Sequence, residues 1–386
     1  MLDRMNIFRT TPRIVMGPGA INALGREVRD LGSDRAMIVT DAGIVKAGLL
    51  VPVEASLKQA KVKYSVFSDV APDPRHQTVE SCLAAMRVFK PTSVIGLGGG
   101  SPIDIAKTSA IMFKNEGSII DYCGIDLVPK PGLPSIMIPT TAGTGSEVTP
   151  IAILSDEDEK LKKGVVSPYL FPKTALLDPL LTLGLPPAIT AATGMDALIH
   201  AIESYTSVNA TGITDMLAAR AIELIAENLR TAYAHGGNID ARSAMLEGSL
   251  LAGISFANAG VTAVHAFAYP IGAQFHIPHG VANTLMLAEV MRFNLVGNVR
   301  KFADIAALMG EPVEDLSDRE AAEVAVDAIE LLAEDLQVPS SLGEFGVTES
   351  HIDDLAEGVM KVTRLLANNP RVLCKKDAVD IYRRVL

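Results

Sequence analysis

Four side chains in the second half of the sequence could together hold a divalent transition metal. They are one carboxylate and three imidazoles: Asp196, His200, His265 and His279. Asp196 and His200 stand at positions i and i+4, so a helix would place both side chains on one face. Mixed carboxylate and imidazole ligation suits Fe(II), Zn, Co, Ni or Mn. An isolated pair of this kind is common and each histidine alone could be a core imidazole bonded to backbone, so only the set of four predicts a metal site.

The segment from His265 to His279 also contains His276, so it holds three of the seven histidines of the chain. Prolines and glycines punctuate it at Pro270, Gly272, Pro278 and Gly280. We expect them to break the segment into short turns that aim side chains inward from separate elements. A site with four protein ligands can be purely structural, whereas catalysis requires an open coordination position.

A glycine-rich turn in the first half of the sequence could hold phosphate. It reads Gly98-Gly99-Gly100-Ser101-Pro102 and follows the apolar run 92–97. Glycines let backbone amides approach a pyrophosphate, and a helix capped by Ser101, with Asp104 three residues later, would favour its negative charge. The turn lacks the third glycine of the dinucleotide fingerprint and the Gly-Lys-Ser/Thr of a P-loop. A plain strand-to-helix turn is the alternative.

Two other segments could complete a nucleotide site. Asp41 follows the apolar run 35–40, where a carboxylate could accept hydrogen bonds from an adenosine ribose and repel a 2′-phosphate; it could instead cap a helix. The loop 139–149 follows another apolar run and is rich in hydroxyls and backbone donors; it could instead be a polar loop closed by local bonds. A metal site and a nucleotide site together predict metal-assisted redox chemistry.

Strand-like and helix-like segments alternate as far as about residue 184. Short apolar runs typical of buried strands are 35–40, 63–67, 92–97 and 135–138, and helical stretches are 20–31 and 77–89. This alternation predicts an α/β domain over residues 1–184 with a mostly parallel sheet and helices on both faces. We expect residues 7–16 to form a short strand or hairpin broken at Pro12, and residues 156–163 to form a solvated turn.

The pattern becomes helical after residue 184, which predicts an all-α metal-binding and catalytic domain over residues 185–386. The expected helices are 188–207, 212–234, 240–257, 281–296, 299–309, 318–336, 350–364 and 376–385.

Composition limits the class of partner and the compartment. The 386 residues are 48% hydrophobic and carry a net charge of −11, which argues against nucleic acid or an anionic membrane as the main partner. Three scattered cysteines fit a reducing cytosol. The sequence has no N-terminal run of signal length and no apolar run of ~18 residues. We therefore expect a cytoplasmic protein.

At these motifs the chain resembles the iron-containing (group III) alcohol dehydrogenase family. Four blocks in family order carry the resemblance: residues 98–104, 139–149, 192–203 and 265–280. The resemblance implies a dehydroquinate synthase-like architecture with a cleft between the two domains. It implies that Asp196, His200, His265 and His279 bind one metal ion. That ion is usually Fe(2+), with Zn(2+) or another divalent transition metal as the alternative. It also implies a homodimer or a larger homo-oligomer.

The resemblance further implies an NAD site in which Asp41 selects NAD over NADP. The residues it places around the pyrophosphate are Gly98, Gly99, Gly100, Ser101 and Asp104, and those lining the rest of the site are Thr140, Thr141, Thr144, Thr149 and Lys162. One position departs from the family pattern. Many members carry a second histidine four residues after the equivalent of His265, often proposed in proton transfer, and this chain has Tyr269 there. Tyr269, His276 or solvent are the candidates for the proton relay.

The prediction is an NAD(H)-linked alcohol dehydrogenase or aldehyde reductase for a small primary alcohol or diol. The metal would act as a Lewis acid that lowers the alcohol's pKa, and hydride would pass to the nicotinamide. One alternative is a glycerol dehydrogenase-like or dehydroquinate synthase-type enzyme, which typically uses zinc with three protein ligands. Another is an oxidoreductase for hydroxyacids or phosphonate aldehydes, although no arginine cluster lies near His265 in the sequence. A non-enzymatic nucleotide-binding protein with a closed metal site is the third.

Overall fold

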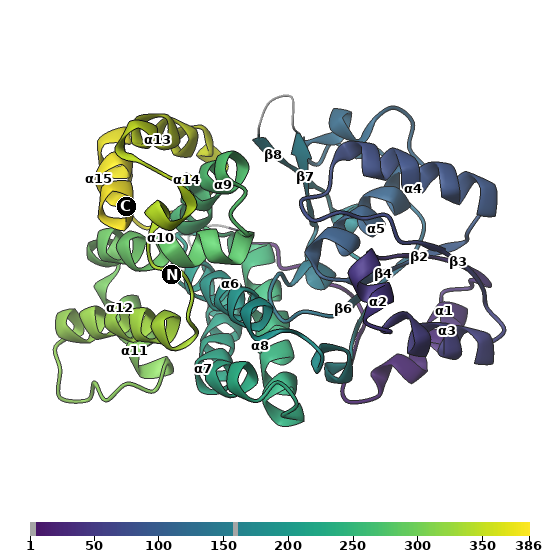
Figure 1. Cartoon of the computed structure of the whole chain (residues 1–386), viewed down its shortest axis with the longest axis horizontal. Coiled ribbons are helices and arrows are strands. Elements are labelled where there is room, and N and C mark those ends of the chain that lie inside the picture. Colours follow the sequence, from purple (N-terminus) through teal and green to yellow (C-terminus); the bar gives the residue numbers. More distant parts are fainter. Residues whose placement is uncertain (1–4, 157–160) are drawn as a thin grey trace. The chain divides into compact units, whose positions relative to one another are not determined.

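The computed structural model describes residues 5–156 and 161–386 (Figure 1). The chain forms two compact units, an α/β unit of residues 10–184 and a helical unit of residues 185–386 that also includes the N-terminal residues as far as Arg9. Arg9 belongs to the helical unit because its backbone N–H donates to Asn258 Oδ1 at 2.8 Å and its carbonyl accepts from Asn258 Nδ2 at 3.0 Å. The domain assignment from sequence, 1–184 and 185–386, differs only in where these N-terminal residues belong.

The α/β unit is built on a six-stranded sheet in which every strand pair is parallel. In spatial order the strands are β1 (Ile14–Met16), β9 (Thr174–Leu177), β6 (Ser135–Pro139), β4 (Ser93–Gly98), β2 (Arg35–Val39) and β3 (Lys63–Phe67). The runs at 35–40, 63–67, 92–97 and 135–138 form four of these strands. They read as continuous apolar runs because helices cover both faces of the sheet.

Helices lie on both faces of this sheet, with α1 and α3 on one face and α4 and α5 on the other (Figure 1). The helices of the unit are α1 (Leu24–Asp30), α2 (Ala42–Lys46), α3 (Leu50–Gln59), α4 (His76–Phe89) and α5 (Gly100–Met112), and its 3₁₀ turns are η1 (Ala20–Ala23), η2 (Ile119–Tyr122), η3 (Ser146–Val148), η4 (Pro168–Leu170) and η5 (Pro179–Thr182). Successive strand residues face opposite cores: Met37 packs with α4 and α5, whereas Ile38 packs with α1 and α3.

A second, three-stranded sheet corrects one expectation. It contains β5 (Gly124–Ile125), β8 (Leu161–Val166) and β7 (Ile151–Asp156) in that order, with β7 and β8 antiparallel. Residues 156–163 were expected to be a solvated turn, but the strands enter this segment from both sides, and residues 157–160 lie outside the described chain. The buried side chains of Ala152, Leu154 and Val165 alternate as a half-buried sheet requires. The charges of the segment masked that pattern.

The helical unit contains ten α-helices within the described residues. They are α6 (Pro187–Thr206), α7 (Gly212–Ala234), α8 (Ile239–Ala259), α9 (Ala263–Phe275), α10 (His279–Asn294), α11 (Val299–Leu308), α12 (Asp318–Asp335), α13 (Ile352–Lys361), α14 (Thr363–Leu366) and α15 (Lys375–Val385), with 3₁₀ turns η6 (Leu295–Gly297), η7 (Leu342–Phe345) and η8 (Glu349–His351). Together with the parallel sheet, this confirms the predicted fold class of an α/β domain followed by an all-α domain.

Helix α9 was not expected, since Pro270 lies in its middle. A proline inside a helix removes one N–H donor and crowds the carbonyl four residues earlier. Burial outweighs that cost here, because most of α9 is buried, including His265 and Phe267. The Tyr382 hydroxyl donates to the Phe267 carbonyl at 2.7 Å, which adds a side-chain donor in the turn before the proline.

No single helix in the described residues is both long and apolar enough to cross a membrane. Helices α8 and α9 reach that threshold only as a pair, and the pair is bent by 102°.

Candidate functional site

Three helices of the helical unit bring the predicted metal ligands together. Helix α6 carries Asp196 and His200 one turn apart, α9 carries His265, and His279 is the first residue of α10. Helix α10 can start beside α6 because Gly280 has no side chain: a Cβ there would lie 2.1 Å from the Ala192 carbonyl oxygen. The glycine therefore permits the close backbone approach that places His279 next to Asp196.

Asp196, His265 and His279 each offer one ligand atom, and within the described residues these three atoms lie within 4.8 Å of one another. Asp196 Oδ1 is 3.9 Å from His265 Nε2 and 3.8 Å from His279 Nε2. His200 adjoins the group through His265, with 3.1 Å between the two Nε2 atoms. The structure thus gathers all four predicted ligands, three of them in one tight set.

Glu203, which the sequence analysis did not single out, orients His265. Its Oε2 lies 2.5 Å from His265 Nδ1, while its Oε1 accepts from the Thr262 hydroxyl at 2.6 Å and the Val264 N–H at 2.7 Å. A carboxylate on Nδ1 fixes the imidazole tautomer that leaves Nε2 as a lone-pair donor, an arrangement typical of metal-ligating histidines. Its place on α6 one turn beyond His200 could have suggested this role, but the partner on α9 is not visible in sequence.

The electrostatics of the site favour a positive charge. Burial by itself would raise the pKa of Asp196, but the charges of His200, His279 and His265 outweigh it and the pKa lies below its usual value. Burial likewise opposes protonation of His265, yet Glu203 and Asp196 raise its pKa. The buried carboxylates of Asp196 and Glu203 therefore favour a positive charge among the imidazoles, either a proton or a metal cation. A divalent metal satisfies them with neutral histidines, so the residues present fit a metal ion.

In the α/β unit, the candidate cofactor residues gather where strands β2, β4 and β6 end. Gly98 has φ 145°, and a Cβ there would lie 2.7 Å from Pro102 Cγ and 3.4 Å from Asp41 Oδ2. Cβ atoms on Gly99 and Gly100 would contact the side chains of Thr141 and Thr144 at 3.5 and 3.0 Å. The chain reverses its direction across the sheet between β2 and β4, and ligands of open α/β sheets bind at such a point.

Two further observations fit a nucleotide at this edge. The Thr140 hydroxyl is buried at the end of β6 and has no hydrogen-bond partner within the described chain, which a ligand could supply. Asp41 both caps α2 and lies beside the turn: its Oδ1 accepts from the Ile44 N–H at 2.9 Å, while its Oδ2 would lie 3.4 Å from a Cβ on Gly98. The capping alternative considered for Asp41 is therefore compatible with a second role.

Ser101 and Asp104 differ from the expectation. Helix α5 begins at Gly100 with Gly99 as its N-cap, so Ser101 lies within the first turn and does not cap it. The Asp104 carboxylate is buried and accepts from the Ser146 hydroxyl at 2.6 Å and the Ile153 N–H at 2.9 Å. Both of its oxygens are engaged inside the unit, so Asp104 joins α5 to the 146–153 segment.

Thr149 and Lys162 lie further along the same segment. The Lys107 ammonium donates to the Thr149 hydroxyl at 3.3 Å, and Lys162 on β8 pairs with Asp73 at 2.7 Å. The structure therefore brings Asp41, the glycine turn and the threonine loop together, whereas the contacts of Lys162 are with a different loop.

Two protein-family models together match most of the chain. The model of the iron-containing alcohol dehydrogenase matches residues 11–179, and that of the C-terminal part of the Fe-containing alcohol dehydrogenase family matches residues 190–386. The chain belongs to the iron-containing alcohol dehydrogenase family. It is 43% identical to long-chain-alcohol dehydrogenase 1 of Geobacillus thermodenitrificans, over 95% of this chain and 93% of the relative.

Two solved structures extend the comparison. A 1,3-propanediol oxidoreductase has a TM-score of 0.97 and 40% identity, covering 99% of this chain and all of the other. The sulfoacetaldehyde reductase of Bifidobacterium kashiwanohense, in complex with NAD+, has a TM-score of 0.89 and 31% identity, covering 99% of both chains. The chain is thus an oxidoreductase of the iron-containing alcohol dehydrogenase family.

The two candidates for a proton relay in this iron-containing alcohol dehydrogenase lie in different surroundings. Tyr269 is one turn beyond His265 on α9, and its ring centroid is 6.2 Å from that of His279. His276 ends α9 in the left-handed region, with φ 54°, and is exposed. The structure therefore brings Tyr269, but not His276, into ring contact with the predicted ligands.

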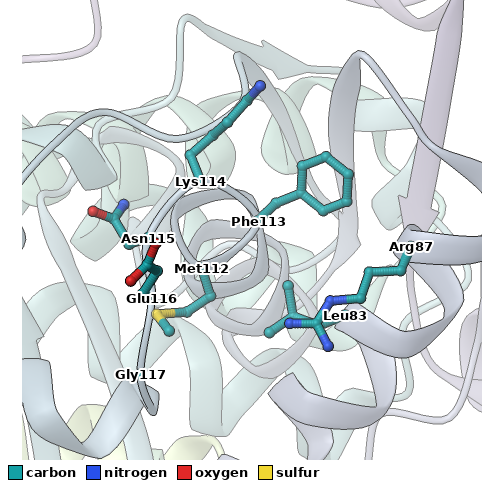
Figure 2. Close-up of a pocket in the computed structure, with 8 residues that line it drawn as sticks. All are labelled: Leu83, Arg87, Met112, Phe113, Lys114, Asn115, Glu116 and Gly117. Atoms are coloured by element: carbon teal, nitrogen blue, oxygen red, sulfur yellow. The ribbon is translucent and has the colours of Figure 1, made fainter.

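The α/β unit also has a hollow of about 430 Å³ (Figure 2). It is lined by Leu83 and Arg87 of α4 and by residues 112–117. The glycine turn is at the start of α5, whose 13 residues span about 20 Å, and the hollow is at its other end. Figure 2 shows the Lys114 side chain pointing away from Arg87, so the two cations do not converge on an anion.

Proposed function

We propose that the protein is an NAD(H)-linked alcohol dehydrogenase or aldehyde reductase that acts on a small primary alcohol or diol with Fe(2+) or another divalent transition metal. The observation that carries the proposal is the convergence of Asp196, His265 and His279, whose ligand atoms lie within 4.8 Å of one another. Family membership and the nucleotide-type edge of the α/β unit support it.

The metal would be held by Asp196, His200, His265 and His279. A divalent cation there supplies Lewis acidity that lowers the pKa of an alcohol hydroxyl. Glu203 keeps a proton on His265 Nδ1, so that Nε2 presents its lone pair to the cation. Burial of Asp196 and His265 limits the access of water to their ligand atoms.

The cofactor would be held by the α/β unit. Gly98, Gly99, Gly100 and Ser101 would present backbone amides to the pyrophosphate at the N-terminus of α5. Asp41 would accept hydrogen bonds from the ribose and exclude a 2′-phosphate, which favours NAD over NADP. Thr140, Thr141, Thr144 and Thr149 would complete the site together with Lys162, whose ammonium would exchange its pairing with Asp73 for the cofactor. Asp104 would hold α5 to the 146–153 segment. The NAD+ in the related sulfoacetaldehyde reductase structure supports this choice of cofactor.

Tyr269 is the better candidate for moving the alcohol proton, because its ring lies beside His279 whereas His276 is exposed at the end of α9. Its phenol could take part directly or through one water molecule.

The class of substrate has two candidates. Phe256 stacks on the His200 ring at a centroid distance of 4.3 Å and offers an apolar surface, which favours an uncharged alcohol. The likeness to a sulfoacetaldehyde reductase supports the second candidate, an aldehyde that carries an acidic group such as a carboxylate or a phosphonate.

The test is to load the purified protein anaerobically with Fe(II) and to follow NADH absorbance with short alcohols, diols, hydroxyacids and the matching aldehydes. A chelated sample serves as the control. Turnover that depends on metal and prefers uncharged substrates supports the proposal, and preference for the acids selects the second candidate. Bound metal and bound NAD without turnover of any compound would contradict the enzyme assignment.

We also propose a homodimer formed through the edge of the six-stranded sheet. Among the described residues, strand β1 pairs with β9 alone, and it exposes Ile14 and Met16, which are 38% and 47% accessible. An exposed apolar edge strand is a template for pairing with a second copy. Sedimentation of the wild type and of Met16→Lys tests this: a monomeric wild type, or an unchanged dimer in the variant, would contradict it.

A cytoplasmic location is our further proposal. Cys82 and Cys374 are free thiols, and free thiols are usual in reducing compartments. Fractionation of cells that express the protein tests the location.

A further inference from the structure

The side chain of Asn283 lies at the centre of the predicted ligand set. It is on α10, one turn after His279, and is completely buried. Its Nδ2 donates to Asp196 Oδ1 at 2.7 Å and lies 3.2 Å from both His265 Nε2 and His279 Nε2. One amide nitrogen therefore contacts the three atoms that would bind the cation.

The orientation of this amide follows from the charge of Asp196. If the amide were turned over, its carbonyl oxygen would face a carboxylate oxygen with no hydrogen between them. In the orientation seen here, Asn283 Oδ1 is buried without a hydrogen-bond partner in the described chain. A buried acceptor without a partner is unfavourable, so the contact with Asp196 must outweigh that cost.

A second asparagine on the same helix shows what a purely structural residue looks like here. Asn294 donates to Asn369 Oδ1 at 2.8 Å and accepts from Asn369 Nδ2 at 2.7 Å, so both ends of its amide are satisfied. Both asparagines are buried on α10, and only Asn283 leaves one end unsatisfied in order to contact Asp196.

We propose that Asn283 is a positioning residue of the metal centre, which holds the Asp196 carboxylate in the orientation that lets it bind the cation together with His265 and His279. An amide nitrogen carries hydrogens and is no ligand itself, so Asn283 acts through Asp196. The role resembles that of Glu203 toward His265: each partner fixes one ligand by a hydrogen bond. This inference rests on the proposed function only in taking the Asp196 cluster as the metal site.

The experiment measures metal affinity without turnover. The wild type, Asn283→Leu and the matched control Asn294→Leu are stripped of metal, and Co(II) binding is measured by competition with a chelator. The visible spectrum of bound Co(II) reports the coordination geometry. We expect Asn283→Leu to bind Co(II) about 10- to 100-fold more weakly, with an altered spectrum, while Asn294→Leu keeps the affinity and spectrum of the wild type. NADH binding, followed by fluorescence, should not change in either variant.

If Asn283→Leu does not yield folded protein, Asn283→Ser replaces it, because a serine hydroxyl on the same helix is too short to reach Asp196. Wild-type affinity in the Asn283 variants would overturn the inference, and so would an equal loss in Asn294→Leu. A wild type that binds Co(II) but turns over no alcohol would contradict the proposed enzyme and leave this comparison valid. A wild type that does not bind Co(II) at all would overturn both.

Discussion

Lys107 and Asp104 stand one turn apart on α5, with 3.9 Å between Nζ and Oδ1, and both bind Ser146. Lys107 donates to the carbonyl and hydroxyl of Ser146 at 2.9 Å and to the Ile151 carbonyl at 2.5 Å. Burial lowers the pKa of Lys107 to about 8, although Asp104 and Glu147 oppose this effect. The pair therefore ties the helix that follows the glycine turn to the segment that follows the threonine loop.

Replacing Lys107 by Met should loosen the cofactor site. Removing one partner of a buried ion pair typically costs about 3–5 kcal/mol of stability. Because the 146–151 segment would lose its contacts with Lys107, we expect the KM for NAD to rise by a larger factor than kcat falls. Urea denaturation and NADH fluorescence titration measure the two effects. Lys114→Met, at an exposed position two residues beyond the end of α5, is the control. An unchanged KM for NAD would show that the pair does not position the loop.

Glu147 should make stability depend on pH. Burial raises its pKa from 4.5 to about 7, and its Oε1 has no hydrogen-bond partner in the described chain. The folded state holds this proton more tightly than the unfolded state, so the contribution is present below pH 4.5 and is lost as pH rises through about 7. Lys107, whose charge faces it, keeps its proton over this range.

Glu147→Gln should therefore gain stability over the wild type as pH rises from 4.5 to 7, by at most about 3 kcal/mol. Urea denaturation of both proteins at several pH values gives the difference directly. A constant difference between pH 4.5 and 8 would show that the carboxyl titrates normally.

His265→Ala and His279→Ala should abolish metal retention and activity together, since each removes one ligand of the converged set. The loss of metal affinity should exceed ~100-fold, which is the upper range for residues that only hydrogen-bond to a metal ligand. Metal analysis after gel filtration and the NADH assay are the measurements, with exposed His235→Ala as the control. Full activity in a metal-free variant would refute metal-assisted catalysis.

Glu203→Gln should weaken metal binding about 10- to 100-fold. The amide keeps the shape of the side chain but loses the charge that holds the proton on His265 Nδ1. Co(II) competition with a chelator measures the change, and exposed Glu227→Gln on α7 is the matched control. Unaltered Co(II) affinity would mean that the backbone alone orients His265.

Tyr269→Phe should lower kcat about 100-fold or more if the phenol relays the proton, with metal and NADH binding unchanged. Tyr269→His should retain or raise kcat and shift its pH profile toward that of an imidazole. The pH dependence of kcat distinguishes these cases. If His276→Ala shows the loss and Tyr269→Phe does not, the relay lies at the end of α9.

The parts of this fold that could be predicted from sequence are those with a local pattern. The apolar runs of β2, β3, β4 and β6 and the i, i+4 pair of Asp196 and His200 are visible within a few residues of chain. Helix α9 could not be predicted, because Pro270 argues locally against a helix and only burial in the folded unit overrides it. The β7 and β8 hairpin was missed because the charges at its tip hide the alternation beside them.

The site residues divide in the same way. Glu203 and Asn283 have no metal-type pattern of their own, and their roles follow from partners 62 and 87 residues away in sequence. Asp104 fitted the phosphate turn by spacing, yet its carboxylate turns inward because Ser146 and Ile153 reach it from another segment. Only the tertiary structure supplies such long-range partners.

The four predicted ligands belong to three separate helices, and this links metal supply to the lifetime of the protein. The binding geometry exists only after α6, α9 and α10 have packed, so a cation has affinity for the native state and little for the unfolded chain. By mass action, free metal at 100 times its Kd would add about 2.7 kcal/mol to the free energy of unfolding. A cell short of the metal would therefore lose enzyme molecules to unfolding and proteolysis as well as turnover from those that remain.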